Sequence, residues 1–205
     1  MTKSPFLVFQ DFIPPLLCEK IIDLTGFNTP TMDKDDNPVK TSKRDLDVEQ
    51  ILFTKFEPLI PVIEQHYQVA YKGTEPIQVD WFPEQSEGTA VCDSSSFLRR
   101  KWVRTKDRDF TALVFLSDYQ DTTPFDDEFE VYGGKMEFPQ WGFGFNPQRG
   151  TMVVYPSGPH FINKTSKILI GDLYQAKIHV ATQQPFLFNA VNFPGTYMDW
   201  FKDTA

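Results

Sequence analysis

The sequence is poor in the two residue types that most often build catalytic and metal centres. Among 205 residues there are three histidines and two cysteines. Cys18 and Cys92 are too few for a disulfide framework, which favours a reducing compartment. The histidines are His66, His160 and His179. Any chemistry that depends on an imidazole therefore has few positions available.

Long apolar runs and excess positive charge are also lacking. No run approaches the roughly 20 apolar residues that span a bilayer, and residues 1–9 show no secretory signal pattern. We therefore expect a cytoplasmic protein without a membrane partner. The formal net charge of −8 also disfavours nucleic acid, because a polyanion would need a local basic patch.

The composition indicates a packed globular chain. Hydrophobic residues make up 40% of the sequence and aromatic residues 15%, including 20 phenylalanines. This is ample apolar surface to bury in a core. The length suits one domain, and we predict that residues 1–205 form a single unit.

The first third of the sequence predicts helices. Leu16 to Gly26 has apolar residues at helical spacing and a glycine that can cap its end. Leu46 to Tyr67 has the same pattern, but Pro58 and Pro61 predict a kink or two shorter helices. Together they suggest a helical layer over residues of about 11–70. The polar segment 28–44 lacks periodicity and predicts a surface loop.

From residue 77 onward the pattern changes to short β-rich segments separated by turn residues. They are IQVDWF, GTAVCD, DFTALVFLSDY, EVYGGKMEF, GTMVVYP and ILIGDLYQAKIHVA. Strands that follow helices predict an α+β fold, with the helices packed against one sheet of a sandwich or jelly roll. The β core is expected over residues of about 77–181, and residues 183–205 are expected to cover it.

The order of these segments resembles the prolyl 4-hydroxylase-like branch of the 2-oxoglutarate and Fe(II)-dependent oxygenases. That family has a His-x-Asp pair, a Thr-rich strand, a Gly-Gly strand, a Pro-x-x-Gly turn, a distal histidine and a basic residue on the last strand. The matching elements here are Asp93, Thr111 to Leu116, Gly133 to Phe138, Pro147 with Gly150, His160 and Lys177. The resemblance covers roughly half of the chain.

The resemblance implies a double-stranded β-helix, or jelly roll, with an Fe(II) site at its mouth. Asp93 and His160 would be metal ligands, and Lys177 would bind the co-substrate 2-oxoglutarate. Such a centre leaves positions open for the 2-oxoacid and then O₂. The implied reaction is hydroxylation of an unactivated C–H bond in a protein, peptide or small molecule, with a prolyl residue as one candidate.

One position departs from the family pattern. The His-x-Asp pair would place a histidine at residue 91, where this sequence has Val91, which cannot bind a metal. Cys92 is expected on the opposite face of a strand from Asp93. An engineered substitution, a two-ligand site completed by water, and a lost activity all remain open. The alternative function is therefore an inactive jelly-roll binding module. A cupin-like isomerase would be expected to gather several histidines in one short motif, and none is visible.

Two co-substrate positions also differ from relatives. Phe82 precedes Pro83 where many relatives have a tyrosine that binds 2-oxoglutarate. Some relatives place the basic residue nearer Leu173. Lys177 is the only cation among the alternating residues 173, 175, 177 and 179, so we assign the basic position to Lys177.

Residues Ser96 to Arg108 form a concentrated basic segment. It contains six cations together with Trp102. Two interpretations remain open: a solvated hairpin, or a surface beside the site that receives an acidic protein segment, a nucleotide or another anion.

Overall fold

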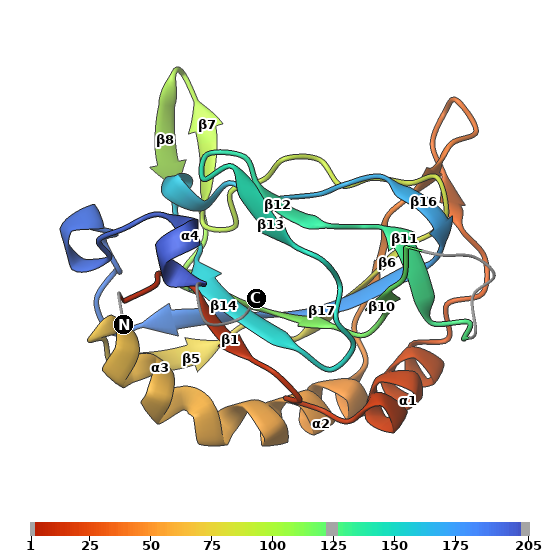
Figure 1. Cartoon of the computed structure of the whole chain (residues 1–205), viewed down its shortest axis with the longest axis horizontal. Coiled ribbons are helices and arrows are strands. Elements are labelled where there is room, and N and C mark those ends of the chain that lie inside the picture. Colours follow the sequence, from red (N-terminus) through yellow and green to blue (C-terminus); the bar gives the residue numbers. More distant parts are fainter. Residues whose placement is uncertain (1–2, 122–126, 202–205) are drawn as a thin grey trace.

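The computed structural model describes residues 3–121 and 127–201. The N-terminal helices lie along one side of the molecule (Figure 1). They are α1 (Pro15–Thr25), α2 (Leu46–Phe56), the short 3₁₀ helix η1 (Glu57–Leu59) and α3 (Ile60–Tyr67). The predicted interruption near Pro58 and Pro61 is confirmed. Gly26 ends α1 with a φ of 56°, a left-handed conformation that suits glycine.

A large antiparallel sheet lies above these helices. Its strands are β1 (Leu7–Phe9), β4 (Thr41–Lys43), β5 (Tyr71–Thr74), β6 (Gln78–Phe82), β9 (Phe110–Phe115), β14 (Met152–Pro156) and β17 (Leu173–Thr182). The strand order is β1-β14-β9-β17-β6-β4, and β5 also pairs with β17. Strands far apart in sequence therefore lie side by side.

Alternation along β9 separates the two faces of this sheet. Ala112 and Val114 belong to the same buried cluster as Leu52 of α2. Leu113 and Phe115 belong to a second cluster on the other face. Successive side chains of a strand point to opposite faces, so one face packs on the helices and the other faces the inside of the roll.

The second layer consists of short strands on the side of the large sheet opposite the helices (Figure 1). They are β10 (Asp118–Tyr119), β11 (Glu130–Gly133), β12 (Met136–Phe138), β13 (Phe143–Phe145), β15 (Lys164–Thr165) and β16 (Ile168–Gly171). They form two sheets with the orders β10-β11-β16 and β13-β12-β15. The predicted α+β architecture, with helices on one sheet, is confirmed.

A separate hairpin projects from this body (Figure 1). It consists of β7 (Ser95–Leu98) and β8 (Lys101–Arg104), and we call it the basic hairpin. It begins after the segment 88–93, which we expected to be a strand. Only an isolated bridge at Val91 forms there.

The prediction of an irregular loop over residues 28–44 is wrong, although most of the segment is exposed at the surface as expected. The segment forms the small hairpin β2 (Thr31–Met32) and β3 (Pro38–Val39), and β4 then joins the edge of the large sheet. Ser42 Oγ donates a hydrogen bond of 2.6 Å to the buried carboxylate of Asp80. Ser42 therefore has a partner inside the protein, which periodicity alone does not reveal.

The C-terminal segment packs against aromatic side chains. It includes η3 (Ala190–Asn192) and the short helix α4 (Tyr197–Trp200). Phe188 lies with its ring 4.9 Å from that of Phe161, and Trp200 lies 6.2 Å from Phe6. The last part of the expected covering segment, 202–205, lies outside the described residues. None of the helices in residues 3–121 and 127–201 has the length and hydropathy needed to cross a bilayer.

Candidate functional site

A pocket of about 520 Å³ lies where the inner face of β6 and β17 meets the basic hairpin. Its wall combines charged, polar and aromatic side chains. The lining residues are Lys40, Gln78, Asp80, Ala90, Val91, Cys92, Asp93, Ser95, Ser96, Phe97, Trp102, Thr105, Lys106, Arg108, Lys177 and His179. The predicted residues Asp93 and Lys177 are both among them.

Asp93 is a buried hydrogen-bond acceptor at this pocket. One of its oxygens, Oδ2, accepts bonds from Asn163 Nδ2 at 2.9 Å, the Tyr155 hydroxyl at 3.0 Å and Thr111 Oγ1 at 3.1 Å. The donors come from β9, β14 and the segment before β15, so the fold itself holds this carboxylate in place.

Thr111 extends this network to His179. Its hydroxyl lies 3.1 Å from His179 Nδ1 and 2.8 Å from Ser157 Oγ. Burial lowers the pKa of His179 to about 4, and the charges of Arg108 and Lys177 act in the same direction. His179 is therefore a neutral hydrogen-bonding group at pH 7.

The floor of the pocket is charged but balanced. Burial acts to raise the pKa of Asp80 and Asp93, but the charge of Lys177 and hydrogen bonds to both groups leave each pKa below its usual value. Lys40 Nζ lies 3.3 Å from Asp80 Oδ2. Both carboxylates are thus ionised at neutral pH, with Lys40 and Lys177 as their cations.

His160 lies in a different environment. It is exposed on the 3₁₀ helix η2 (Pro159–Phe161), and its ring centroid is 5.4 Å from that of Phe188. Its backbone carbonyl accepts a bond from Trp141 Nε1 at 2.7 Å. The pocket wall, as far as the described residues define it, does not include His160. A metal ion shared by Asp93 and His160 stays a prediction.

Asn163 is the residue opposite Val91, and no sequence motif indicated it. The two residues exchange backbone hydrogen bonds, with Val91 N to Asn163 O at 2.8 Å and the reverse bond at 2.9 Å. Side chains of such a pair lie close together on the same face. Only strand pairing identifies this partner, because 72 positions separate the two residues along the chain.

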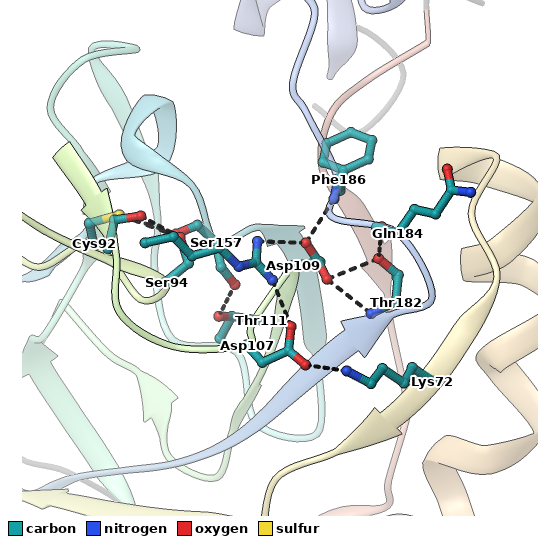
Figure 2. Close-up of polar contacts among 12 residues, drawn as sticks. Lys72, Cys92, Ser94, Asp107, Asp109, Thr111, Ser157, Thr182, Gln184 and Phe186 are labelled. Carbon is teal, nitrogen blue, oxygen red and sulfur yellow. Dashed lines mark hydrogen bonds and ion pairs between the residues drawn. The ribbon is translucent and has the colours of Figure 1, made fainter.

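The base of the basic hairpin is fixed by a second buried carboxylate, Asp109 (Figure 2). Arg104 Nη1 donates to Asp109 Oδ1 at 2.9 Å, and the Phe186 amide donates to the same oxygen at 2.8 Å. Thr182 donates to Oδ2 through both its amide and its hydroxyl. Asp109 therefore connects the hairpin, the end of β17 and the C-terminal segment.

No protein-family model and no curated protein sequence matches this chain. Solved structures do. The viral collagen prolyl hydroxylase of Paramecium Bursaria Chlorella virus-1, in complex with 2-oxoglutarate, superposes with a TM-score of 0.66 at 14% identity, covering 88% of this chain and 97% of that one. The chain has the prolyl hydroxylase fold.

Two further structures agree. A prolyl-4-hydroxylase from Pseudomonas putida gives a TM-score of 0.59 at 12% identity and covers 88% of this chain and 94% of that one. A prolyl hydroxylase from Trichoplax adhaerens, in complex with a hypoxia-inducible factor peptide, gives 0.59 at 10% identity and covers 87% and 84%. The predicted jelly roll of the 2-oxoglutarate oxygenases is therefore confirmed as the fold.

The residues around Asp93 do not fit the Fe(II) centre that this fold implies. Val91 has no donor atom, and the amide of Asn163 is already bonded to Asp93 Oδ2. In the parts of the chain that the structure describes, no three histidine, cysteine or acidic side chains gather where they could hold a metal ion. A single carboxylate provides too few ligands to hold Fe(II), which such centres bind with two histidines and one carboxylate.

The alternative position for a basic residue on the last strand is apolar in this structure. Leu173, the alternative position of the basic residue, is buried in a cluster with Phe82, Val131 and Ile168. These side chains offer no hydrogen-bond donor to a carboxylate. The remaining candidate for the basic residue is Lys177, whose charge already interacts with the carboxylates of Asp80 and Asp93.

Proposed function

We propose that this chain is a ligand-binding module that uses the prolyl hydroxylase fold without Fe(II)-dependent turnover. The observation that supports this most directly is the Asn163 amide on Asp93 Oδ2, opposite Val91. An amide nitrogen donates its hydrogens and is not a metal ligand. The carboxylate then serves as the acceptor of a buried network instead of binding a metal.

The pocket itself supports a role in binding an anion. In the described part of the chain, Lys106 has no hydrogen-bond or ion-pair partner, whereas the charge of Lys177 acts on Asp80 and Asp93. The lining residues include four cations and two carboxylates. Arg108 is paired with Glu75, which leaves the charge of Lys106 in excess, whereas the whole chain carries −8. A locally positive pocket in an acidic protein favours an anionic ligand.

Metal titration tests the proposal. Fe(II) or Mn(II) is titrated with 2-oxoglutarate into the protein, into Val91→His, into Asn163→His and into the double variant, and succinate is measured in air. We expect metal affinity to rise at least about 100-fold only in the double variant, because only there would two imidazoles lie beside Asp93. Tight Fe(II) binding and oxygen-dependent succinate formation by the unmodified protein would refute the proposal.

An active 2-oxoglutarate dioxygenase is the second candidate. The fold and the position of Asp93 and Lys177 in one pocket favour it. Here Asp93 and His160 would bind Fe(II), Lys177 would bind 2-oxoglutarate, and the substrate would be a C–H bond such as that of a prolyl residue. His160→Ala distinguishes the candidates: it abolishes metal uptake and succinate formation under this one and changes neither under the first.

A further inference from the structure

We infer that the ligand of this pocket is a nucleotide, with its base against the wall of the basic hairpin and its phosphate at the pocket rim. The inference rests on the proposed function, since it assumes that the pocket binds a ligand. Three features of the pocket support it: an aromatic wall, a cationic rim and a polar floor of balanced charge.

The aromatic wall consists of Phe97 and Trp102. They are directly opposed across β7 and β8, and their ring centroids are 5.3 Å apart at an interplanar angle of 59°. They remain 60% and 40% exposed although they line a cavity. Exposed aromatic faces beside a polar pocket are the surfaces on which nucleic-acid bases stack.

The cationic rim lies at the end of the same hairpin. No acidic residue occurs between Ser94 and Lys106. Lys106 is exposed and has no ion-pair partner within the described residues. Arg108, next along the rim, is held by Glu75 through Nε at 2.8 Å. Lys106 is thus the cation available to a phosphate.

The floor can hydrogen-bond to the edge of a base. Gln78 lines the pocket, with its amide nitrogen donating to Asp80 Oδ1 at 2.6 Å, and Asp93 lines it with a carboxylate that can accept from an amino group. Asp80 is fully buried, so its charge acts on the floor without touching a ligand. Because Lys40 and Lys177 balance these charges, the floor favours a neutral polar group over a second anion. A simple carboxylic acid would leave the wall and floor unused. A volume of about 520 Å³ is ample for one nucleotide.

The tip of the hairpin carries two further cations. They lie where a single strand would have further phosphates, whereas a free nucleotide has none there. Arg99 and Arg100 have φ values of 48° and 65°, in a two-residue turn that usually contains Asn-Gly. Side chains other than glycine are strained in this region, and such strain is often retained at functional sites. The two arginines extend the cations beyond the pocket, where further phosphates of a strand would lie.

Titration calorimetry with AMP, adenosine and inorganic phosphate tests the inference. We expect AMP to bind at least about tenfold more tightly than either fragment, because both the wall and the rim contribute. Trp102→Ala and Lys106→Ala should each weaken AMP binding about tenfold. Lys101→Ala is the matched control, since this lysine lies on the hairpin but not in the pocket wall, and it should leave AMP binding unchanged.

A second titration identifies the source of the nucleotide. An octamer of deoxyadenylate is compared with AMP in the double variant Arg99→Asn, Arg100→Gly, which keeps a turn-forming sequence. Weaker binding of the octamer alone supports a strand end, and unchanged binding of both supports a free nucleotide.

Three results would each overturn the inference. They are phosphate binding as strong as AMP binding, an AMP affinity insensitive to Trp102→Ala, and binding of octaglutamate but not of AMP. The metal titration uses no nucleotide, so its result stands separately.

Discussion

Among single residues, Asp93 is a carboxylate that the fold holds in place through a buried hydrogen-bond network. It is 6% exposed, and three donors converge on one of its oxygens. Removing an ionised acceptor from such a network leaves several donors unpaired, which costs more than the hydrogen bonds themselves.

Asp93→Ala is therefore expected to lower the free energy of unfolding by about 3–5 kcal/mol. Tyr155→Phe, which removes one donor and keeps the ring, should cost about 1 kcal/mol. Urea denaturation with and without EDTA measures both. A loss on Asp93→Ala that appears only in the presence of metal would instead indicate a metal ligand.

His179 determines a pH dependence of stability. Its folded pKa of about 4 lies below the unfolded value of about 6.5. The unfolded chain therefore binds a proton first as the pH falls, and stability is lost between about pH 6.5 and pH 4. The loss should be on the order of 3 kcal/mol. Denaturation curves across this range should show a shallower pH slope for His179→Gln, and an unchanged slope would contradict the assignment.

At the scale of elements, the basic hairpin combines a strained tip with a firmly bonded base. The positive φ values of Arg99 and Arg100 cost roughly 1–2 kcal/mol each in residues other than glycine. Asp109 holds the base through Arg104. The hairpin is thus fixed at its base and presents arginines at a turn where asparagine and glycine would be more stable.

Arg99→Asn with Arg100→Gly is expected to stabilise the protein by about 1–2 kcal/mol, because both residues tolerate the left-handed conformation. Thermal denaturation at matched ionic strength provides the measurement. A lower melting temperature would show that the arginine side chains make stabilising contacts that outweigh the backbone strain.

Asp109→Ala should release the C-terminal segment from the end of β17. The Phe186 amide would lose its acceptor, so its hydrogen exchange should accelerate by at least about tenfold. Amides of α2 serve as the internal control, since this helix does not contact Asp109 in the bonds described. Unchanged exchange at Phe186 would show that aromatic packing alone holds the segment.

At the scale of the whole molecule, one buried cluster joins the helices to the large sheet. Leu52 and Phe56 of α2 share it with Val114 of β9 and Ile178 of β17. The helices therefore complete the core of the sheet, and the sheet's outer face would be exposed without them.

Leu52→Ala is expected to lower the free energy of unfolding by about 2–5 kcal/mol through lost burial and a residual cavity. Circular dichroism and tryptophan fluorescence should report a single coincident transition, because the helical and β layers share this core. Separate transitions would contradict the prediction that residues 1–205 form one unit.

The sequence was sufficient for features that depend on local order. Pro58 and the alternation along residues 173–179 predicted the broken helix and the inner face of β17, and the order of the β segments predicted the fold. The pairing of Val91 with Asn163 could not be predicted, because register between distant segments depends on tertiary structure. For the same reason the polar segment before Arg44 looked like a loop, although its partner Asp80 lies on another strand.

The bridge between Val91 and Asn163 also limits how this protein could change over time. A histidine at either position alone would still face a neighbour that gives a metal nothing, so the first replacement would bring no selective advantage. At position 163 it would also break the hydrogen bond to Asp93 and cost stability before any gain. A centre made of Asp93 and two histidines at these positions would therefore require two coordinated replacements, and selection for the packed network would oppose the intermediate.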